Sequence, residues 1–307
     1  MRHQRPLIDW FMLLVLAVLW GSSFLFVKIA VREITPVTLV AARFVVAASV
    51  LSVAVRARGL RLPTSRRVWS HYLLMGLIGN AIPFTLIAWG QIRVDVGLAG
   101  ILMGVMPLMT LLLAHYFVPG ERMTPRMAGG FAVGFIGLVA LLGPEALLEL
   151  GGEASDLLSQ LAIALAAICY AINTIISRRL AKLDPLVSAT TVMWVTGAIM
   201  VPTALWVDRP WKLVLSAESI ASAVWLGLFA TALATIVYFR VIQTAGPTFL
   251  SLINYMIPVV ALAAGAIVLD EALVGTVLIG MALILTGLAI SQFGSRTMGK
   301  GSRIGGA

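Results

Sequence analysis

Polar and aromatic side chains recur at helical spacing inside several long apolar stretches of the sequence. Asn80, Phe84 and Gln91 follow steps of four and seven residues, so they share one face of a helix. Tyr170 and Asn173 share a face in a later stretch. Polar residues among apolar ones are costly unless they face protein or a water-filled cavity. Amides, hydroxyls and rings on such faces can bind a small molecule that has polar and apolar parts.

We expect the following residues to line a cavity: Trp20, Ser23, Asn80, Phe84, Trp89, Gln91, Met103, Tyr170, Asn173, Thr235, Tyr238 and Asn254. Each has a structural alternative. Ser and Thr in membrane helices often bond the carbonyl of the preceding turn, and Trp89 lies near enough to the end of its stretch to be an interfacial anchor. The three asparagines carry the strongest expectation, because an amide has several hydrogen-bonding positions to satisfy in a dry environment.

Carboxylates are absent from the middle of these stretches. Asp95, Glu121, Asp270 and Glu271 all fall at the ends, so the buried carboxylate that a site for organic cations would need is missing. No pair of Lys or Arg is placed centrally to neutralise a phosphate. Amides, hydroxyls and rings suit a zwitterion with an apolar or aromatic side chain instead.

Arg43 is the one charge well inside a stretch, roughly 10 Å from its end at about 1.5 Å per residue. It could bind a substrate carboxylate. The interpretation that we favour is that its side chain extends outward to the membrane interface or pairs with loop carbonyls, as long basic side chains commonly do. We therefore leave Arg43 out of the predicted cavity.

Other chemistry finds little support in the sequence, and we predict no cofactor, metal site or catalytic residue. The single cysteine, Cys169, cannot form an internal disulfide, and the three histidines show no metal-ligand spacing. No phosphate-binding loop of the Walker type is present. The net charge of +9 comes from short basic clusters between apolar runs, which read as topology signals rather than a nucleic-acid surface.

The composition excludes a soluble globular protein. Of the 307 residues, 60% are hydrophobic and 11% are charged, whereas soluble domains carry about 25% charged residues. The first apolar run, from Trp10 to about Ala30, is too long for a signal peptide and is followed by many similar runs. The chain is therefore expected to be an all-α integral membrane protein.

Ten apolar windows are long enough to span a bilayer as helices. They lie at 10-31, 36-56, 68-93, 97-118, 125-143, 157-180, 186-206, 219-243, 247-269 and 272-292. With the N-terminus inside, sixteen of the 22 basic residues fall on the inner side, as the positive-inside rule requires. Ten spans with both termini in the cytoplasm is the predicted topology.

The two halves of the chain resemble each other. The segment Pro107 to Glu121, followed by Gly130 and Gly137, is matched by Pro258 to Glu271, followed by Gly280 and Gly287. We predict a first five-helix repeat over residues 1-145, a second over 157-292, and a cytoplasmic tail over 293-307. Because five is odd, the second repeat is inverted relative to the first, which is the architecture of many secondary transporters.

Several short motifs together resemble the EamA-type branch of the drug/metabolite transporter superfamily. They are Trp20-Gly21-Ser22-Ser23-Phe24 ending in Lys28, Ala42-Arg43-Phe44, Pro107 with Gly120-Glu121, and Pro258 with Asp270-Glu271. The resemblance covers about residues 10 to 292 and is nearest to the aromatic amino-acid exporters of bacterial inner membranes. It implies a central cavity among the first, third, fourth, sixth, eighth and ninth helices. Arg43 has no basic counterpart in the second half, where Met193-Trp194 fall.

Together these features predict a secondary transporter of the bacterial inner membrane that exports neutral amino acids, aromatic or large and apolar, by alternating access. Pro83, Gly100, Pro107 and Pro258 are candidate hinges. The expected partners are an amino-acid substrate and the lipid bilayer, without nucleic acid, in a monomer or homodimer. The alternative is efflux of amphipathic drugs or other small metabolites, and a polytopic membrane enzyme is the remote one.

Overall fold

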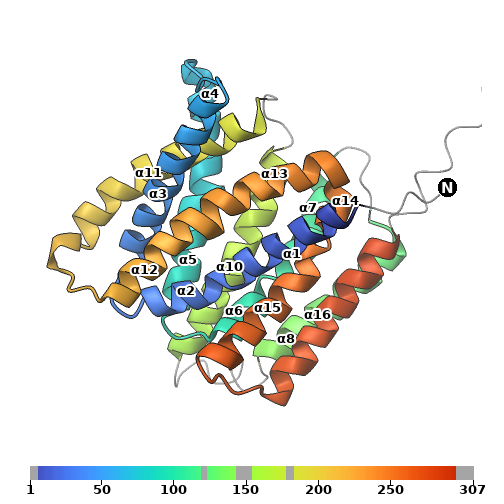
Figure 1. Cartoon of the computed structure of the whole chain (residues 1–307). Coiled ribbons are helices and arrows are strands. Elements are labelled where there is room, and N and C mark those ends of the chain that lie inside the picture. The colour runs from blue at the N-terminus through green and yellow to red at the C-terminus, as the bar shows by residue number, and fades with distance from the viewer. Residues whose placement is uncertain (1–5, 119–122, 143–153, 178–182, 295–307) are drawn as a thin grey trace, which may run out of the picture.

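The computed structural model describes residues 6–118, 123–142, 154–177 and 183–294, and within them all regular secondary structure is helical (Figure 1). The tail beyond 294, Glu121 and most of the acidic loop after residue 142 lie outside these ranges. The first half contains α1 (Leu7–Gly21), α2 (Ser23–Ala30), α3 (Pro36–Ala57), α4 (Arg66–Gly76), the π-helix η1 (Leu77–Ala81), α5 (Ile82–Gly90), α6 (Val96–Leu102), α7 (Val105–Phe117) and α8 (Pro125–Leu142).

The described part of the second half is also helical. It contains α10 (Ala154–Ser177), α11 (Pro185–Val207), the short 3-10 helix η2 (Pro210–Lys212), α12 (Ala217–Trp225), the π-helix η3 (Leu226–Leu233), α13 (Ala234–Ala245), α14 (Pro247–Leu250), α15 (Ile253–Val268) and α16 (Gly275–Gly294). Every predicted window coincides with one helix or a consecutive set of helices, and the ends agree within about three residues.

The expectation of an all-α membrane protein is confirmed. Among the described residues, seven helical stretches are long and apolar enough to cross a membrane, and three further apolar helices, Pro125–Ala140, Ile253–Val268 and Gly275–Ser291, are shorter. A count of ten crossings requires the shorter three to cross as well, and it stays a prediction. So do the inverted repeats, because the helix assignments alone do not test them.

Several of the long stretches are not continuous α-helices. The α1–α2 stretch is interrupted at Ser22, and α6 is separated from α7 at Met103 and Gly104. The π-helices η1 and η3 occupy corresponding places in the third and eighth stretches, at nearly the offset of the sequence repeat. π-helical turns are rare overall, but those that occur are often at functional sites. The segments η1 and η3 are therefore candidate parts of the functional site.

Helices from the two halves pack against each other in pairs. In Figure 1 α8 lies beside α16, green beside red, and α3 lies beside α11, blue beside yellow. The other contacts between the halves include α5 with α10, α6 with α15, α1 with α15, and α2 with α12. Much of the core between α3 and α11 is formed by small and apolar side chains, namely Phe44, Ala47, Ala48, Leu51, Met193, Met200 and Ala204.

The α8–α16 pair depends on glycines at which the two backbones nearly touch. A Cβ atom placed on Gly130 would lie 2.5 Å from the carbonyl oxygen of Gly287. A Cβ atom on Gly137 would lie 2.8 Å from the backbone nitrogen of Ile284. Small residues at helix interfaces allow this approach in a bilayer, where van der Waals packing drives association.

One end of the bundle is closed by carboxylates that cap helices of the other half. Glu271, in the connection between α15 and α16, accepts hydrogen bonds from the N–H groups of Val96 and Gly97 at 2.7 and 3.0 Å. These are unpaired donors at the start of α6, where a negative charge is also favoured by the helix dipole. Gly265 leaves room for the Glu271 carboxylate, because a Cβ there would collide with it.

Carboxylates in two more connections at this end also accept hydrogen bonds at helix starts of the other half. Asp208 accepts from the N–H and the hydroxyl of Thr38 at the start of α3, both at 2.9 Å. Glu33 accepts from the Ser216 N–H at 2.7 Å before α12. This backbone hydrogen bond is the main reason that the pKa of Glu33 lies below its ordinary value. These bonds join the α15–α16 connection to the α5–α6 connection, and the α11–α12 connection to the α2–α3 connection. We call these four connections the capped end.

The α8–α16 contact can be tested with neighbouring glycines. Gly130→Ala inserts a methyl group against the α16 backbone and should lower the free energy of unfolding by about 1–3 kcal/mol. Gly129→Ala, where a Cβ would meet nothing within 4 Å, should be neutral or slightly stabilising because alanine is the better helix former. Thermal unfolding of the purified proteins compares them, and equal midpoints for both variants would contradict the proposed close contact.

The capping role of Glu271 has an adjacent control. Glu271→Gln removes the charge and one of two acceptor oxygens, so it should cost about 1–3 kcal/mol of stability. Asp270→Asn changes an exposed neighbour with a positive φ of 53°, which asparagine tolerates, and should cost little. The measurement is again the unfolding midpoint. A Glu271→Gln protein as stable as Asp270→Asn would show that the cap contributes nothing.

Candidate functional site: an arginine and aromatic rings in the bundle interior

Arg43 is buried in the middle of α3, with 5% of its surface exposed. Its Nε donates a hydrogen bond to Thr231 Oγ1 at 2.6 Å, and its guanidinium carbon lies 4.5 Å from the centre of the Phe84 ring. The interpretation that this side chain extends outward to the interface is therefore wrong. The face of α3 that carries Arg43 packs against η3 and α5, so the interior takes up the side chain.

The π-helix η3 places the acceptor for Arg43. Thr231 donates its hydroxyl hydrogen to the Leu226 carbonyl, five residues back, at 2.8 Å, so its oxygen faces the guanidinium with a lone pair. Gly227 in the same segment lets α3 approach, because a Cβ on it would lie 3.1 Å from the carbonyl oxygen of Arg43. The wide turn and the glycine together bring η3 against α3.

Aromatic rings from other helices complete this region. Phe84 of α5 contacts Phe44 with ring centres 5.0 Å apart and Tyr170 of α10 with ring centres 5.9 Å apart, both edge to face. This is the favoured geometry for ring pairs. Arg43, Phe84, Tyr170 and Thr231 thus converge from α3, α5, α10 and η3, and we call these four residues the Arg43 cluster.

A second aromatic pair joins α1 to α13. The rings of Trp20 and Tyr238 lie 5.6 Å apart, and Tyr238 contacts Phe239 at 5.2 Å. Trp20, Tyr238, Phe84 and Tyr170 are all half-buried. The structure therefore brings four of the predicted cavity residues together in two pairs.

The predicted amides lie on three different helices. Asn80 in η1 donates to Thr196 Oγ1 at 3.3 Å, and Asn254 donates to the Ser251 carbonyl at 3.1 Å at the break before α15. Asn173 on α10 packs against Gly79, where a Cβ would collide with its amide. Its Oδ1 is buried and has no hydrogen-bond partner among the described residues, which leaves an acceptor available in the interior.

Other predicted residues donate hydrogen bonds to backbone carbonyls or lie away from the centre. The hydroxyls of Ser23 and Thr235 donate to carbonyls three and four residues back in the same stretch, those of Trp20 and Thr231, at 2.6 Å each. Gln91 is fully buried and donates to the Phe24 carbonyl at 2.9 Å, and its Oε1 has no hydrogen-bond partner among the described residues. Trp89 is 43% exposed near the end of α5, and Met103 packs on a core cluster at the break after α6. Their role in binding stays a prediction.

The candidate hinges fall near the irregular segments. Pro83 lies in the first turn of α5, directly after η1, and Pro107 lies in the first turn of α7, after the break at Met103. A proline is tolerated there because its missing N–H is not needed. Pro258 lies inside α15, and Gly100 faces Ala261, whose side chain a Cβ on Gly100 would meet.

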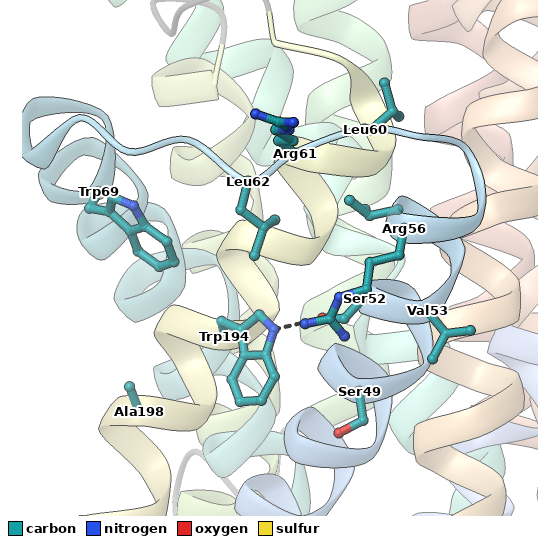
Figure 2. A pocket seen from close by; sticks show the side chains of 11 residues that line it. Ser49, Ser52, Val53, Arg56, Leu60, Arg61, Leu62, Trp69, Trp194 and Ala198 are labelled. Atoms are coloured by element: carbon teal, nitrogen blue, oxygen red, sulfur yellow. Dashed lines mark hydrogen bonds between the residues drawn. The ribbon is translucent and has the colours of Figure 1, made fainter.

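A hollow lies elsewhere, on the flank of the bundle between α3, the start of α4 and α11. It has a volume of about 920 Å³, and Figure 2 shows Arg56, Arg61, Trp69 and Trp194 around it, with Trp194 donating to Ser52 at 2.8 Å. None of the predicted cavity residues lines it. Its wall includes Val53, which is 65% exposed, so this hollow faces outward and is not the central site.

The central arrangement can bind but has little means of making or breaking bonds. The described residues contain no group of three His, Cys, Asp or Glu placed to hold a metal. The site offers one guanidinium, several rings, an amide acceptor and hydroxyls. Sequence reasoning missed Arg43 and left Thr231 out of the predicted set. The signal for both was the isolated charge within an apolar stretch, which by itself indicates a functional site.

Comparison with known proteins agrees with this architecture. The "Probable terminal-alkyne amino-acid exporter" of Streptantibioticus cattleyicolor is 26% identical over 94% of this chain and 94% of its own. The "Probable amino-acid metabolite efflux pump" of Escherichia coli K12 is 26% identical over 94% of this chain and 96% of its own. The "Uncharacterized transporter YoaV" of Bacillus subtilis is 24% identical over 90% and 93%.

A known crystal structure has the same fold, with a TM-score of 0.67 and 23% identity over 95% of this chain and 99% of that chain. The profile of the EamA-like transporter family matches residues 8–143 and, a second time, residues 157–293. The protein therefore belongs to the EamA-like transporter family and is a multi-pass membrane transporter of small molecules rather than an enzyme.

Proposed function

We propose that this transporter exports neutral amino acids with aromatic or large apolar side chains across a bacterial inner membrane. The observation that carries the proposal is the pairing of interior rings from separate helices, Trp20 with Tyr238 and Phe84 with Tyr170. Such rings offer apolar area for a large side chain. Relatives named as an amino-acid exporter and an amino-acid metabolite efflux pump support amino acids as the cargo class.

We further propose alternating access by two inverted five-helix repeats. Two matches of the family profile, one to each half, support the duplication. The helix contacts also support the duplication. The π-helix η1 of the first half contacts α11 of the second half, and the π-helix η3 of the second half contacts α3 of the first half. In this proposal both termini are cytoplasmic, and the capped end lies on the opposite, outer side of the membrane. When the cavity opens to the outer side, the carboxylate caps of the capped end separate from the helices that they cap.

Transport by purified protein in liposomes tests the cargo. Proteoliposomes preloaded with unlabelled substrate should exchange radiolabelled tryptophan and phenylalanine faster than threonine, whereas empty liposomes should not. Trp20→Ala and Tyr238→Ala each remove a large contact surface and should raise KM for tryptophan about tenfold or more. Trp206→Ala, which removes an 84% exposed ring near the end of α11, is the matched control and should leave KM unchanged.

Two results would contradict this proposal. Wild-type protein that exchanges no aromatic amino acid would exclude the cargo and direct the search to amphipathic drugs and other metabolites. An equal rise of KM in Trp206→Ala would show that loss of any tryptophan disturbs the protein. Unfolding midpoints of all three variants separate altered binding from a general loss of stability.

A further inference from the structure

Arg43 is the one cation buried among the described residues, and no carboxylate accompanies it. The described chain contains two ion pairs, Lys28 with Asp95 and Arg93 with Asp156, and neither involves Arg43. Of its five N–H donors, only the Nε–H has a hydrogen-bond acceptor among the described residues, the hydroxyl of Thr231. The terminal nitrogens of the guanidinium therefore have no acceptor in this part of the chain.

A buried, unpaired charge of this kind is expensive. Removing an ion from water is costly unless a partner compensates for it. The Thr231 hydroxyl and the Phe84 ring compensate in part, because a neutral dipole and a ring face both attract a cation. The other buried charge among the described residues, Asp9, lies in the first turn of α1 and accepts from the Thr244 hydroxyl at 2.7 Å. Arg43 lies deeper in its helix and retains unused donors.

Thr231 and Phe84 hold the guanidinium of Arg43, and its two terminal nitrogens are left to bind an anion. The Nε bond to Thr231 and the contact with Phe84 hold the group from two sides. The two terminal nitrogens then present parallel N–H groups, the fork that binds a carboxylate through both oxygens. No second basic side chain is buried nearby in the described residues, so the charge matches a singly charged anion rather than a phosphate.

We propose that Arg43 forms the carboxylate subsite of the transport cavity and binds the carboxylate of the amino-acid substrate through its terminal nitrogens. The inference rests on the proposed function, since it assumes an amino-acid cargo. In this arrangement the rings of Phe84 and Tyr170 lie beside the bound head group, and Thr231 is a positioning residue that holds the guanidinium. The substrate carboxylate supplies the counter-charge that the protein itself lacks at this place.

The test compares two ligands that differ only in the carboxylate. Binding of tryptophan and of tryptophanamide to the purified full-length protein is measured by calorimetry for wild type, Arg43→Gln, Arg43→Lys and the control Arg32→Gln, whose exposed side chain follows α2. Wild type and the control should bind tryptophan about tenfold to a hundredfold more tightly than the amide. Arg43→Gln should lose this preference with the amide affinity nearly unchanged, and Arg43→Lys should keep part of it.

Each contrary result has a distinct meaning. If wild type binds both ligands equally, the carboxylate subsite is wrong while amino-acid export stands, and this comparison needs no folded variant. If Arg43→Gln elutes as a folded protein and keeps the preference, the subsite is likewise wrong. If wild type binds neither ligand and liposomes show no exchange of aromatic amino acids, the proposed function fails and the inference fails with it.

Discussion

A polar group inside a bilayer has no water to bind, and this constraint determines where the irregular parts of the protein lie. The long stretches satisfy most of their backbone internally, and the π-helices η1 and η3 pack on α10 and α3 respectively. The π-helix η3 is the clearest case, because its side chain Thr231 bonds both its own backbone and Arg43. The same constraint brings the amides of Asn80 and Asn173 into the interior. The polar side chains lie in the interior because the surrounding lipid cannot bind them, as well as because a substrate can.

The two halves are held together by different forces in different places. At the capped end, Glu271, Asp208 and Glu33 bond helix N-termini of the opposite half. These contacts are few and directional, and separating them exposes groups that water can satisfy. Along α8 and α16 the contact is continuous, and glycines bring backbone against backbone. The contacts at the capped end are therefore easier to separate than the contact along the α8–α16 pair.

The sequence was enough to predict the helices but not how their side chains meet. The length of an apolar run is a local property, and prolines such as Pro36 and Pro185 mark helix starts, so span positions agreed closely. The direction of Arg43 depends on η3, which is far away in the chain and whose widened turn has no sequence signature. The amide nitrogen of Gln91 bonds the Phe24 carbonyl, a partner that tertiary packing supplies and the sequence does not reveal, and the place of Gln91 in the cavity stays a prediction. The carboxylate caps were missed for the same reason.

The α8–α16 pair also constrains how the protein is made. On the order of 130 residues separate the end of α8 from the start of α16, so at about 5–20 residues per second the ribosome needs up to roughly half a minute to supply the partner. During that time the glycine face of α8 has only lipid or another helix to pack against. A nascent chain that stops before α16 leaves this face open to α8 of a second copy. The first half therefore has its α8 face covered only when α16, the last helix of the second half, has been synthesised.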